Sequence, residues 1–324
     1  MATELSRNFK EVPEVRHKSK YFTSHFWAET LWALARTILV AGICYIIIYP
    51  LLIKLSSSMM TENDMYDMLV KWIPRKLNYD SIVQNYRLLY GYMKYPSALF
   101  NSLVLASIVA LLQMVSSSLI GYGFARFDFF GKNLFFALVI LTLLVPPQMI
   151  MVPMFLNFRF FDFFGMMPAS VNLLGTYWPF ILTSITGMGL RNGFFIYIMR
   201  QVFKGLPKSL EEAALVDGAG QMRTFLTIMI PGAASAMLVV FLFAFVWQYN
   251  DYQFTRMYLS NTATLLPFSL EQLTRTFDVE SYSKEYISIL NNTGMIMFIA
   301  PLLLLYAFLQ RYFIESIERT GIVG

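Results

Sequence analysis

Residues 206–231 read LPKSLEEAALVDGAGQMRTFLTIMIP, a polar and acidic stretch between two long apolar runs. Local chemistry predicts a helix, a tight turn and a second helix. Ser209 and Glu212 have the spacing of a capping box, which favours a helix start at Ser209. Gly218 reaches positive φ at little cost and so favours a turn there. A second helix should follow and end at Pro231, because proline removes a backbone donor.

The composition around this stretch is that of a membrane protein. The chain has 324 residues, of which 57% are hydrophobic and only 14% charged, whereas soluble domains carry about 25% charged residues. The mean hydropathy is +0.54. The formal net charge of +5 is spread along the chain and does not indicate nucleic-acid binding. The single cysteine, Cys44, can form no internal disulfide, and we expect a small buried hydrophobe there.

Six apolar segments reach the length of about 20 residues that a bilayer crossing needs. The sequence therefore predicts an all-α polytopic membrane protein with six transmembrane helices. Prolines inside these segments, Pro146 and Pro147 among them, predict kinks or breaks. The fourth segment is over-long and should include an amphipathic extension. The segments are Leu31–Ile53, Ala98–Ala125, Leu134–Leu156, Val171–Val202, Gly232–Tyr249 and Met295–Phe313.

These spans divide the chain into an N-terminal arm of residues 1–30, a transmembrane domain of residues 31–316 and a tail of residues 317–324. The arm is basic, but the apolar run after it is too long for a signal peptide, so we expect an uncleaved first span. A weak positive-inside bias favours cytoplasmic termini. Of the two long segments on the other side, the first should hold an interfacial helix near Tyr79–Tyr92.

The stretch 206–231 resembles the EAA loop of ABC-importer permeases. The matching residues are Glu212-Ala213-Ala214, Gly218 and Ile228-Met229-Ile230-Pro231, with Ile230 in place of the family's leucine. A bare EAA triplet would favour a plain helical hairpin instead. The resemblance implies a coupling helix that docks on a cytoplasmic ATPase and so places the loop and both termini in the cytoplasm. The implied coupling residues are Glu212, Ala213, Ala214, Asp217, Gly218, Ile228 and Pro231.

Further blocks resemble the smaller of the two permeases of the carbohydrate-uptake family, the maltose and multiple-sugar type. This implies the ABC type I importer permease fold in a bacterial cytoplasmic membrane. The C-terminal ESIERTGIVG departs from the family's glycine-rich ending, which leaves the role of the tail open. The matching blocks are NSL (101–103), LIGYGFARFDFFGKNLFF (119–136), LLVPPQMIMVPMF (143–155), FVWQYNDYQF (245–254) and TLLPFSL (264–270).

No catalytic machinery is visible in the sequence. There is no phosphate-binding loop of the Gly-x4-Gly-Lys-Ser/Thr type, and His17 and His25 lack a second ligand pair for a metal. We therefore expect no enzyme activity, cofactor or metal on this chain. The resemblance places ATP and magnesium on a partner ATPase. The implied partners are a second, different permease, two ATPase subunits, an extracytoplasmic solute-binding protein and membrane lipid.

Polar residues inside membrane spans are costly and are therefore candidates for the substrate path. Aromatic faces with amide and carboxyl groups suit a sugar. For the aromatic candidates, an interfacial belt is the alternative, and Asn250 and Asp251 could instead form the polar end of a helix. Arg191 could snorkel to the interface or pair with an acid of a partner subunit. The candidates are Gln148, Tyr177, Trp247, Asn250 and Asp251.

Together these features predict half of the translocation path of an ATP-driven importer for a di- or oligosaccharide. One alternative is an ABC permease for another polar solute, such as a polyamine or a phosphonate. Such solutes would favour charged pocket residues, and the spans hold few. A second alternative is a non-transport membrane scaffold that recruits a soluble partner through its loop.

Overall fold

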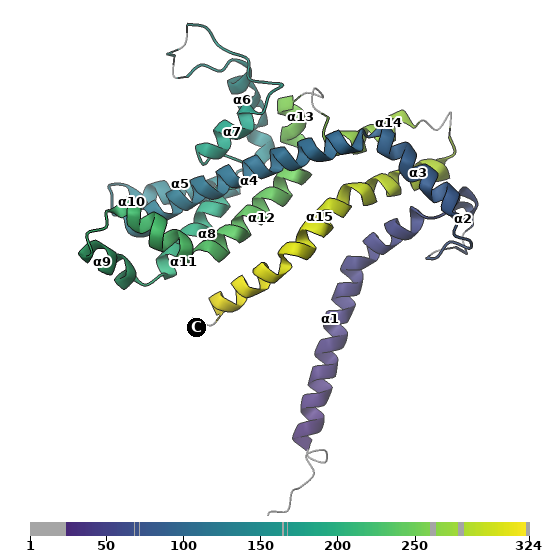
Figure 1. Cartoon of the computed structure of the whole chain (residues 1–324), viewed down its shortest axis with the longest axis horizontal. Coiled ribbons are helices and arrows are strands. Elements are labelled where there is room, and N and C mark those ends of the chain that lie inside the picture. The colour runs from purple at the N-terminus through teal and green to yellow at the C-terminus, as the bar shows by residue number, and fades with distance from the viewer. Residues whose placement is uncertain are drawn as a thin grey trace, which may run out of the picture. The chain divides into compact units, whose positions relative to one another are not determined.

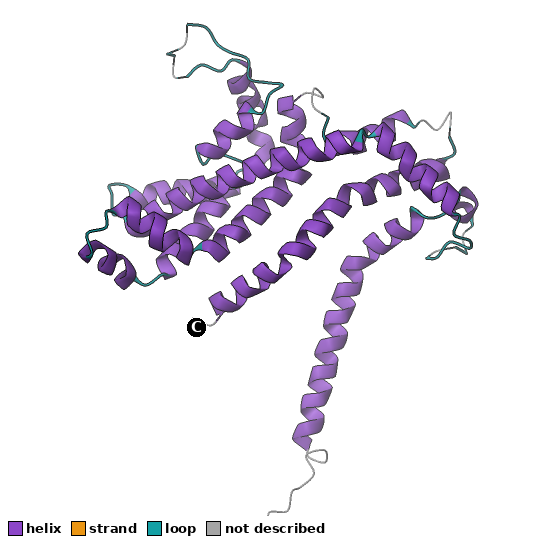
Figure 2. Cartoon of the chain, in the orientation of Figure 1, coloured by secondary structure: helices purple, strands orange, loops and turns teal. Residues whose placement is uncertain are grey.

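The computed structural model describes residues 24–67, 69–70, 72–163, 165–166, 168–259, 264–277 and 282–321. These residues form helices and loops (Figure 2), with one isolated β-bridge between Phe161 and Val171. The predicted all-α class is thus confirmed. The chain divides into two units, Met1–Lys54 and Leu55–Gly324. His17 and most of the N-terminal arm lie outside the described residues.

Three of the described helices are long and apolar enough to cross a membrane. They are α1 (Ser24–Ser57), α4 (Tyr95–Arg126) and α15 (Lys284–Gly321). Helix α15 continues through most of the segment that we set apart as the tail. Cys44 lies in α1 and is exposed, so the expectation of a buried cysteine is wrong for this chain.

Two bent helix pairs are also apolar enough, and the described residues hold up to five candidate spans if each pair is counted as one. Helices α5 (Lys132–Leu144) and α6 (Pro147–Arg159) meet at 104°. The predicted break at Pro146-Pro147 is confirmed, because each proline forces extended backbone on the residue before it. The second pair joins Gln221–Gly232 to α12 (Ala234–Asn250) at 77°.

The predicted fourth span, Val171–Val202, is not one helix. It consists of α7 (Trp178–Ile185) and α8 (Asn192–Gly205), with a turn between them. Gly187 has φ +74° and Arg191 has φ +62°, both in the left-handed region that ends helices. A side chain at Gly189 would meet the Gln113 amide nitrogen at 2.4 Å, so the turn lies directly against α4. The described residues therefore do not confirm the count of six spans exactly, because apolar length alone does not show such a turn.

Helix α4 is the centre of the second unit and lies against α8 and α12 (Figure 1). Small side chains make this close approach possible, as is usual between membrane helices. Ala106 and Ala110 are fully buried on α4. At the crossing with α8, a Cβ on Gly121 would lie 2.7 Å from the Cβ of Met199 and 2.9 Å from the backbone nitrogen of Arg200.

Helix α15 is joined to this core by two tyrosine hydroxyls. Pro301 lies inside α15 and has no N–H for the carbonyl of Met297. Tyr95 on α4 donates a hydrogen bond to that carbonyl at 2.9 Å. Tyr249 on α12 donates to the carbonyl of Phe298, also at 2.9 Å. The proline break is therefore satisfied by neighbouring helices, as the interior of a membrane protein requires.

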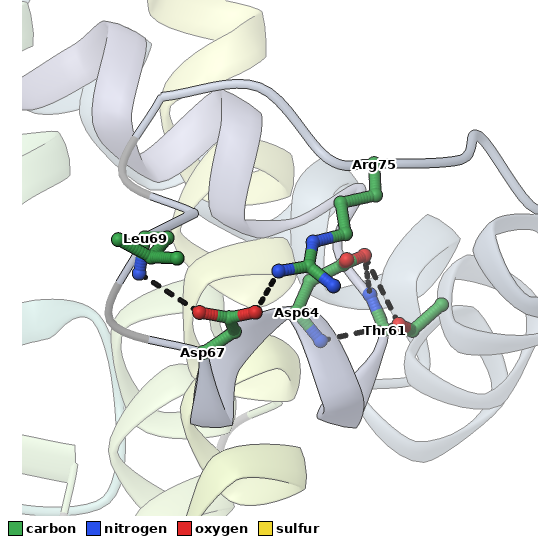
Figure 3. Close-up of polar contacts among 5 residues, drawn as sticks. All are labelled: Thr61, Asp64, Asp67, Leu69 and Arg75. Carbon is green, nitrogen blue, oxygen red and sulfur yellow. Dashed lines mark hydrogen bonds and ion pairs between the residues drawn. The ribbon is translucent and has the colours of Figure 1, made fainter.

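The segment after α1 carries α2 (Glu62–Tyr66) and α3 (Tyr79–Tyr92). A helix is thus confirmed at the predicted position, as α3. Figure 3 shows how α2 begins: Thr61 and Asp64 form a reciprocal capping box. The carboxylate of Asp67 then accepts hydrogen bonds from the Leu69 backbone at 2.9 Å and from Arg75. These contacts order a loop that composition alone describes only as polar.

We expect Gly121→Ala to destabilise the protein, because the new methyl group would overpack the α4–α8 crossing at a cost of about 1–3 kcal/mol. Gly123→Ala is the matched control, since a Cβ there would meet nothing within 4 Å. The thermal unfolding midpoint of the detergent-solubilised protein measures the difference. Equal midpoints for the two variants would contradict the close crossing.

Candidate functional site

The first half of the predicted coupling loop is α9 (Lys208–Val216). It begins after Pro207 and has no side-chain cap. The expected capping box at Ser209 is therefore wrong: the helix starts one residue earlier, because Pro207 already sets the backbone angle. The helix ends at Val216, and the predicted turn follows at Gly218, whose φ is +80°. The Ala219 N–H returns to the Ala214 carbonyl at 2.9 Å and closes the turn.

The second half of the loop is one distorted helix. It consists of α10 (Gln221–Thr224), the π-helix η2 (Phe225–Met229) and α11 (Ile230–Gly232). Pro231 was expected to end this helix, but the 77° bend follows at Ala233 instead. The Ile230 N–H bonds to the Phe225 carbonyl, five residues back. The π-turn thus shifts the backbone hydrogen bonds of the helix from i−4 to i−5 acceptors just before Pro231, which has no N–H to donate.

The outward face of α9 carries both charge and apolar surface. Glu212 and Ala213 are exposed, and Leu215 and Val216 are 53% and 87% exposed. Ala214 is buried whereas Ala213 is exposed, so Ala214 is the alanine of the pair that lies against the core. Exposed apolar side chains beside a carboxylate are typical of a surface that binds a partner protein.

A buried ion pair connects α9 to α4, and the sequence interpretation missed it. Arg126 is the last residue of α4, and its side chain is 6% exposed. Its Nε lies 3.1 Å from Oε1 of Glu211, whose side chain is 17% exposed. Arg126 also donates to the carbonyl of Leu206 at 2.7 Å. The available signal was the Glu-Glu doublet, of which the inner member faces the core and the outer member, Glu212, faces out.

The second half of the loop is held by aromatic packing. Tyr122 on α4 contacts Phe225 of η2 at a ring-centroid distance of 4.7 Å. The Tyr122 ring also contacts Phe203 of α8 and Phe127 after α4, both at 5.5 Å. Aromatic pairs at these distances stabilise a contact beyond their buried area. The loop therefore joins α4 and α8 through two independent sets of contacts, one ionic and one aromatic.

The candidate path residue Trp247 lies among aromatic side chains of its own chain. Its ring stacks on Phe195 at 5.4 Å and on Phe243 at 5.7 Å. The Arg191 guanidinium lies 4.3 Å from the ring centroid of Trp247, a cation–π contact. The structure thus gives Arg191 a partner that neither sequence alternative named.

The neighbouring candidates end α12 and begin α13 (Gln253–Leu259). Asn250 is exposed, and its amide donates to the Val246 carbonyl at 2.7 Å. Asp251 accepts from the backbone N–H and the hydroxyl of Thr255, both at 2.8 Å. Asp251 therefore caps α13, which is the helix-end role that the sequence left open.

Gln148 and Tyr177 belong to elements at this same end of the unit (Figure 1). Gln148 is exposed near the start of α6, and α6 packs on α13. Tyr177 precedes α7 and packs in a cluster around the buried Tyr258 of α13. The structure thus gathers the elements that carry the five candidates, and leaves the amides of Gln148 and Asn250 exposed.

Comparisons with known proteins agree with this geometry. Residues 117–319 match the family described as binding-protein-dependent transport system inner membrane component. This chain belongs to that family.

Among its relatives, the osmoprotective compounds uptake permease protein GgtD of Synechocystis is 32% identical, over 68% of each chain. The maltodextrin transport system permease protein MdxG of Bacillus subtilis is 28% identical, over 86% of this chain and 92% of its own. The arabinooligosaccharides transport system permease protein AraQ of Halalkalibacterium halodurans is 29% identical, over 69% and 73%.

A solved structure supports the same fold. It is a bacterial ABC transporter involved in the import of the acidic polysaccharide alginate, with a TM-score of 0.66. The match covers 88% of this chain and 98% of that one, at 19% identity. The family match and the permease relatives together show that the chain is a membrane permease subunit of an ABC importer.

We expect the two neighbouring glutamates to separate stability from coupling. Glu211→Gln should leave the buried Arg126 charge uncompensated and lower the stability of the transporter by about 1–3 kcal/mol. Glu212→Gln alters only an exposed side chain and should leave the unfolding midpoint unchanged while lowering ATP-driven uptake. Thermal unfolding and uptake, measured on both variants, check this. A Glu212 variant that unfolds earlier than the Glu211 variant would refute the assignment.

Proposed function

We propose that this permease subunit forms half of the translocation path for an uncharged di- or oligosaccharide and couples that path to an ATPase through α9. The observation that carries the proposal is the face of α9. It exposes Glu212, Leu215 and Val216, and Glu211 holds the same helix to α4. A helix that presents a binding face and is fastened to a core helix can transmit the movement of a partner.

The charges near the path support an uncharged solute. A charged solute in a low-dielectric path needs a compensating charge. Of the two charged residues that the sequence placed there, Arg191 lies on the Trp247 ring and Asp251 caps α13. Both are occupied by contacts within the chain, which disfavours a polyamine or a phosphonate. The names of AraQ and MdxG, an arabinooligosaccharide and a maltodextrin permease, support a sugar.

The partners follow from the family resemblance. ATP and magnesium are bound by a separate ATPase dimer, and a second, different permease completes the path. The α9 side faces the cytoplasm, as do both termini. The solute-binding protein docks on the opposite side, where residues around α2 and α3 line an open hollow of about 610 Å³. Asp64, Arg75 and Tyr79 are among the polar residues that line it.

The described contacts supply a route for coupling. When the ATPase dimer closes, it moves α9 together with the corresponding helix of the other permease. The Arg126–Glu211 pair passes this displacement to the end of α4, and the Phe225 contacts pass it to Tyr122 and Phe203. Because packed cores shift between discrete arrangements rather than deform continuously, the bundle turns as a body.

We expect Gly218→Val to abolish ATP-driven uptake while the protein stays in the membrane. Valine at φ +80° costs about 1 kcal/mol or more and would distort the turn between α9 and α10. Gly220→Val is the matched control, because Gly220 has φ −70° and open space around it. Uptake into proteoliposomes that contain the complete transporter measures the effect. Transport at the parental rate by the Gly218 variant would remove α9 from the coupling mechanism.

We also expect Gln148→Ala and Asn250→Ala to weaken sugar uptake several-fold without lowering the unfolding midpoint. Both side chains are exposed, and a lost hydrogen bond to the sugar costs about 0.5–1.5 kcal/mol. Trp247→Ala is the contrasting variant, since removal of its stacked ring should lower stability as well. Labelled-sugar uptake and thermal unfolding distinguish the two effects. Unchanged uptake in both amide variants would assign the sugar contacts to the partner permease.

A further inference from the structure

A polar hollow of about 390 Å³ lies between the α4–α5 connection and the C-terminal part of α8, remote from the path candidates. Three cationic side chains line it: Lys132 at the start of α5, and Arg200 and Lys204 on α8. Asp128 is the one acidic side chain in the lining. Cationic groups from two separate elements therefore converge on one hollow, and positive charge exceeds negative.

The donors of this hollow are only partly used within the described residues. Arg200 lies over the Phe136 ring at 3.8 Å, a contact that uses the face of the guanidinium. Its Nε is buried and has no hydrogen-bond partner in the described part of the chain. The first residues of α5, Lys132, Asn133 and Leu134, also line the hollow, and this helix start has no side-chain cap. The first turn of a helix carries N–H groups without intrahelical partners, which favours an anion nearby.

Lys132 is the one cation of the three with an acidic partner among the described residues. Its Nζ lies 2.9 Å from the Asp128 carboxylate, whose side chain is 97% exposed. The hydrogen bond and charge of Lys132 lower the pKa of Asp128, so this carboxylate stays ionised. Asp128 therefore competes with any anion for Lys132, and its removal should favour that anion.

The surroundings of the hollow identify the source of the anion. Leu134 and Phe135 on α5 are 64% and 51% exposed, and Phe130 is fully exposed beside them. Helix α8 ends at Gly205, three residues before α9 begins. The hollow thus lies where an apolar, lipid-facing helix surface meets the α9 side. A phospholipid whose phosphate binds in the hollow can lay its acyl chains along α5.

We propose that this hollow binds the phosphate group of an anionic membrane phospholipid, with Arg200, Lys204 and Lys132 as its ligands. The site is independent of the identity of the transported solute. A bound headgroup would bridge α5 and α8, and α8 leads directly into α9. Basic pockets between membrane helices on the cytoplasmic side commonly hold anionic headgroups.

Native mass spectrometry of the complete detergent-solubilised transporter, titrated with phosphatidylglycerol or phosphatidylcholine, tests the proposal. We expect preferential retention of phosphatidylglycerol, weakened by roughly fivefold in Arg200→Gln and in Lys204→Gln. Asp128→Asn should strengthen it. Lys284→Gln, which removes one positive charge from the start of α15, is the control and should bind as the parent does. The Asp128 variant is expected to retain more lipid rather than less, so it still tests the proposal if an arginine variant folds poorly.

Two outcomes would overturn the proposal. One is equal retention of the two lipids by the parent, or no difference between the hollow variants and the Lys284 control. The other concerns the source of the phosphate. Inorganic phosphate at matched ionic strength should not displace phosphatidylglycerol. If it does, with the same dependence on Arg200 and Lys204, the hollow is a free-phosphate site rather than a lipid site.

Discussion

The close approach of α4 to α8 is the constraint on which the second unit depends. At Gly121 the two backbones are so near that a single added carbon would collide with Met199. The same helix carries fully buried alanines, and α12 packs against it. In a bilayer, where lipid is as apolar as leucine, close packing of this kind replaces the hydrophobic effect as the force between helices. The end of α4 then fixes the positions of α9 and η2, which contact it.

What is attached to that end is the proposed coupling loop. Arg126 holds α9 through Glu211, and Tyr122 holds η2 through Phe225. The ionic contact costs desolvation, so its worth lies more in fixing position than in net stability. The aromatic contact supplies packing. Because both contacts lie on the last two turns of one helix, a displacement of α9 cannot leave α4 unaffected.

Much of the fold could be predicted from hydropathy and turn chemistry, but local rules failed where tertiary contacts decide. The long helices, α3, the break at Pro146-Pro147 and the positive φ of Gly218 all follow from short-range physics. The turn between α7 and α8 does not, since its glycines serve contact with α4 as much as turn geometry. The Ser209 cap failed because Pro207 had already started the helix. Pro231 was expected to end its helix but lies inside it, because a π-turn precedes it, and residue propensities do not predict π-turns.

The candidate sites show the same division. The EAA pattern located the loop, but not which of two adjacent glutamates faces inward, because that depends on Arg126 from a distant helix. The polar residues at the end of α12 could be predicted from the sequence, because polar side chains inside an apolar span are energetically unfavourable and so indicate a functional role. Their local roles could not be predicted because they depend on neighbouring elements. Asp251 caps α13, and the Trp247 ring contacts the guanidinium of Arg191 from the α7–α8 turn.

The central claim is that the exposed face of α9 binds the ATPase. A photo-crosslinking side chain placed at position 216, where Val216 is 87% exposed, tests it in the complete transporter in native membranes. The account predicts a covalent adduct between this chain and the ATPase subunit from position 216, and none from position 69 in the segment between α2 and α3. An ATPase adduct from position 69 but not from position 216 would contradict it.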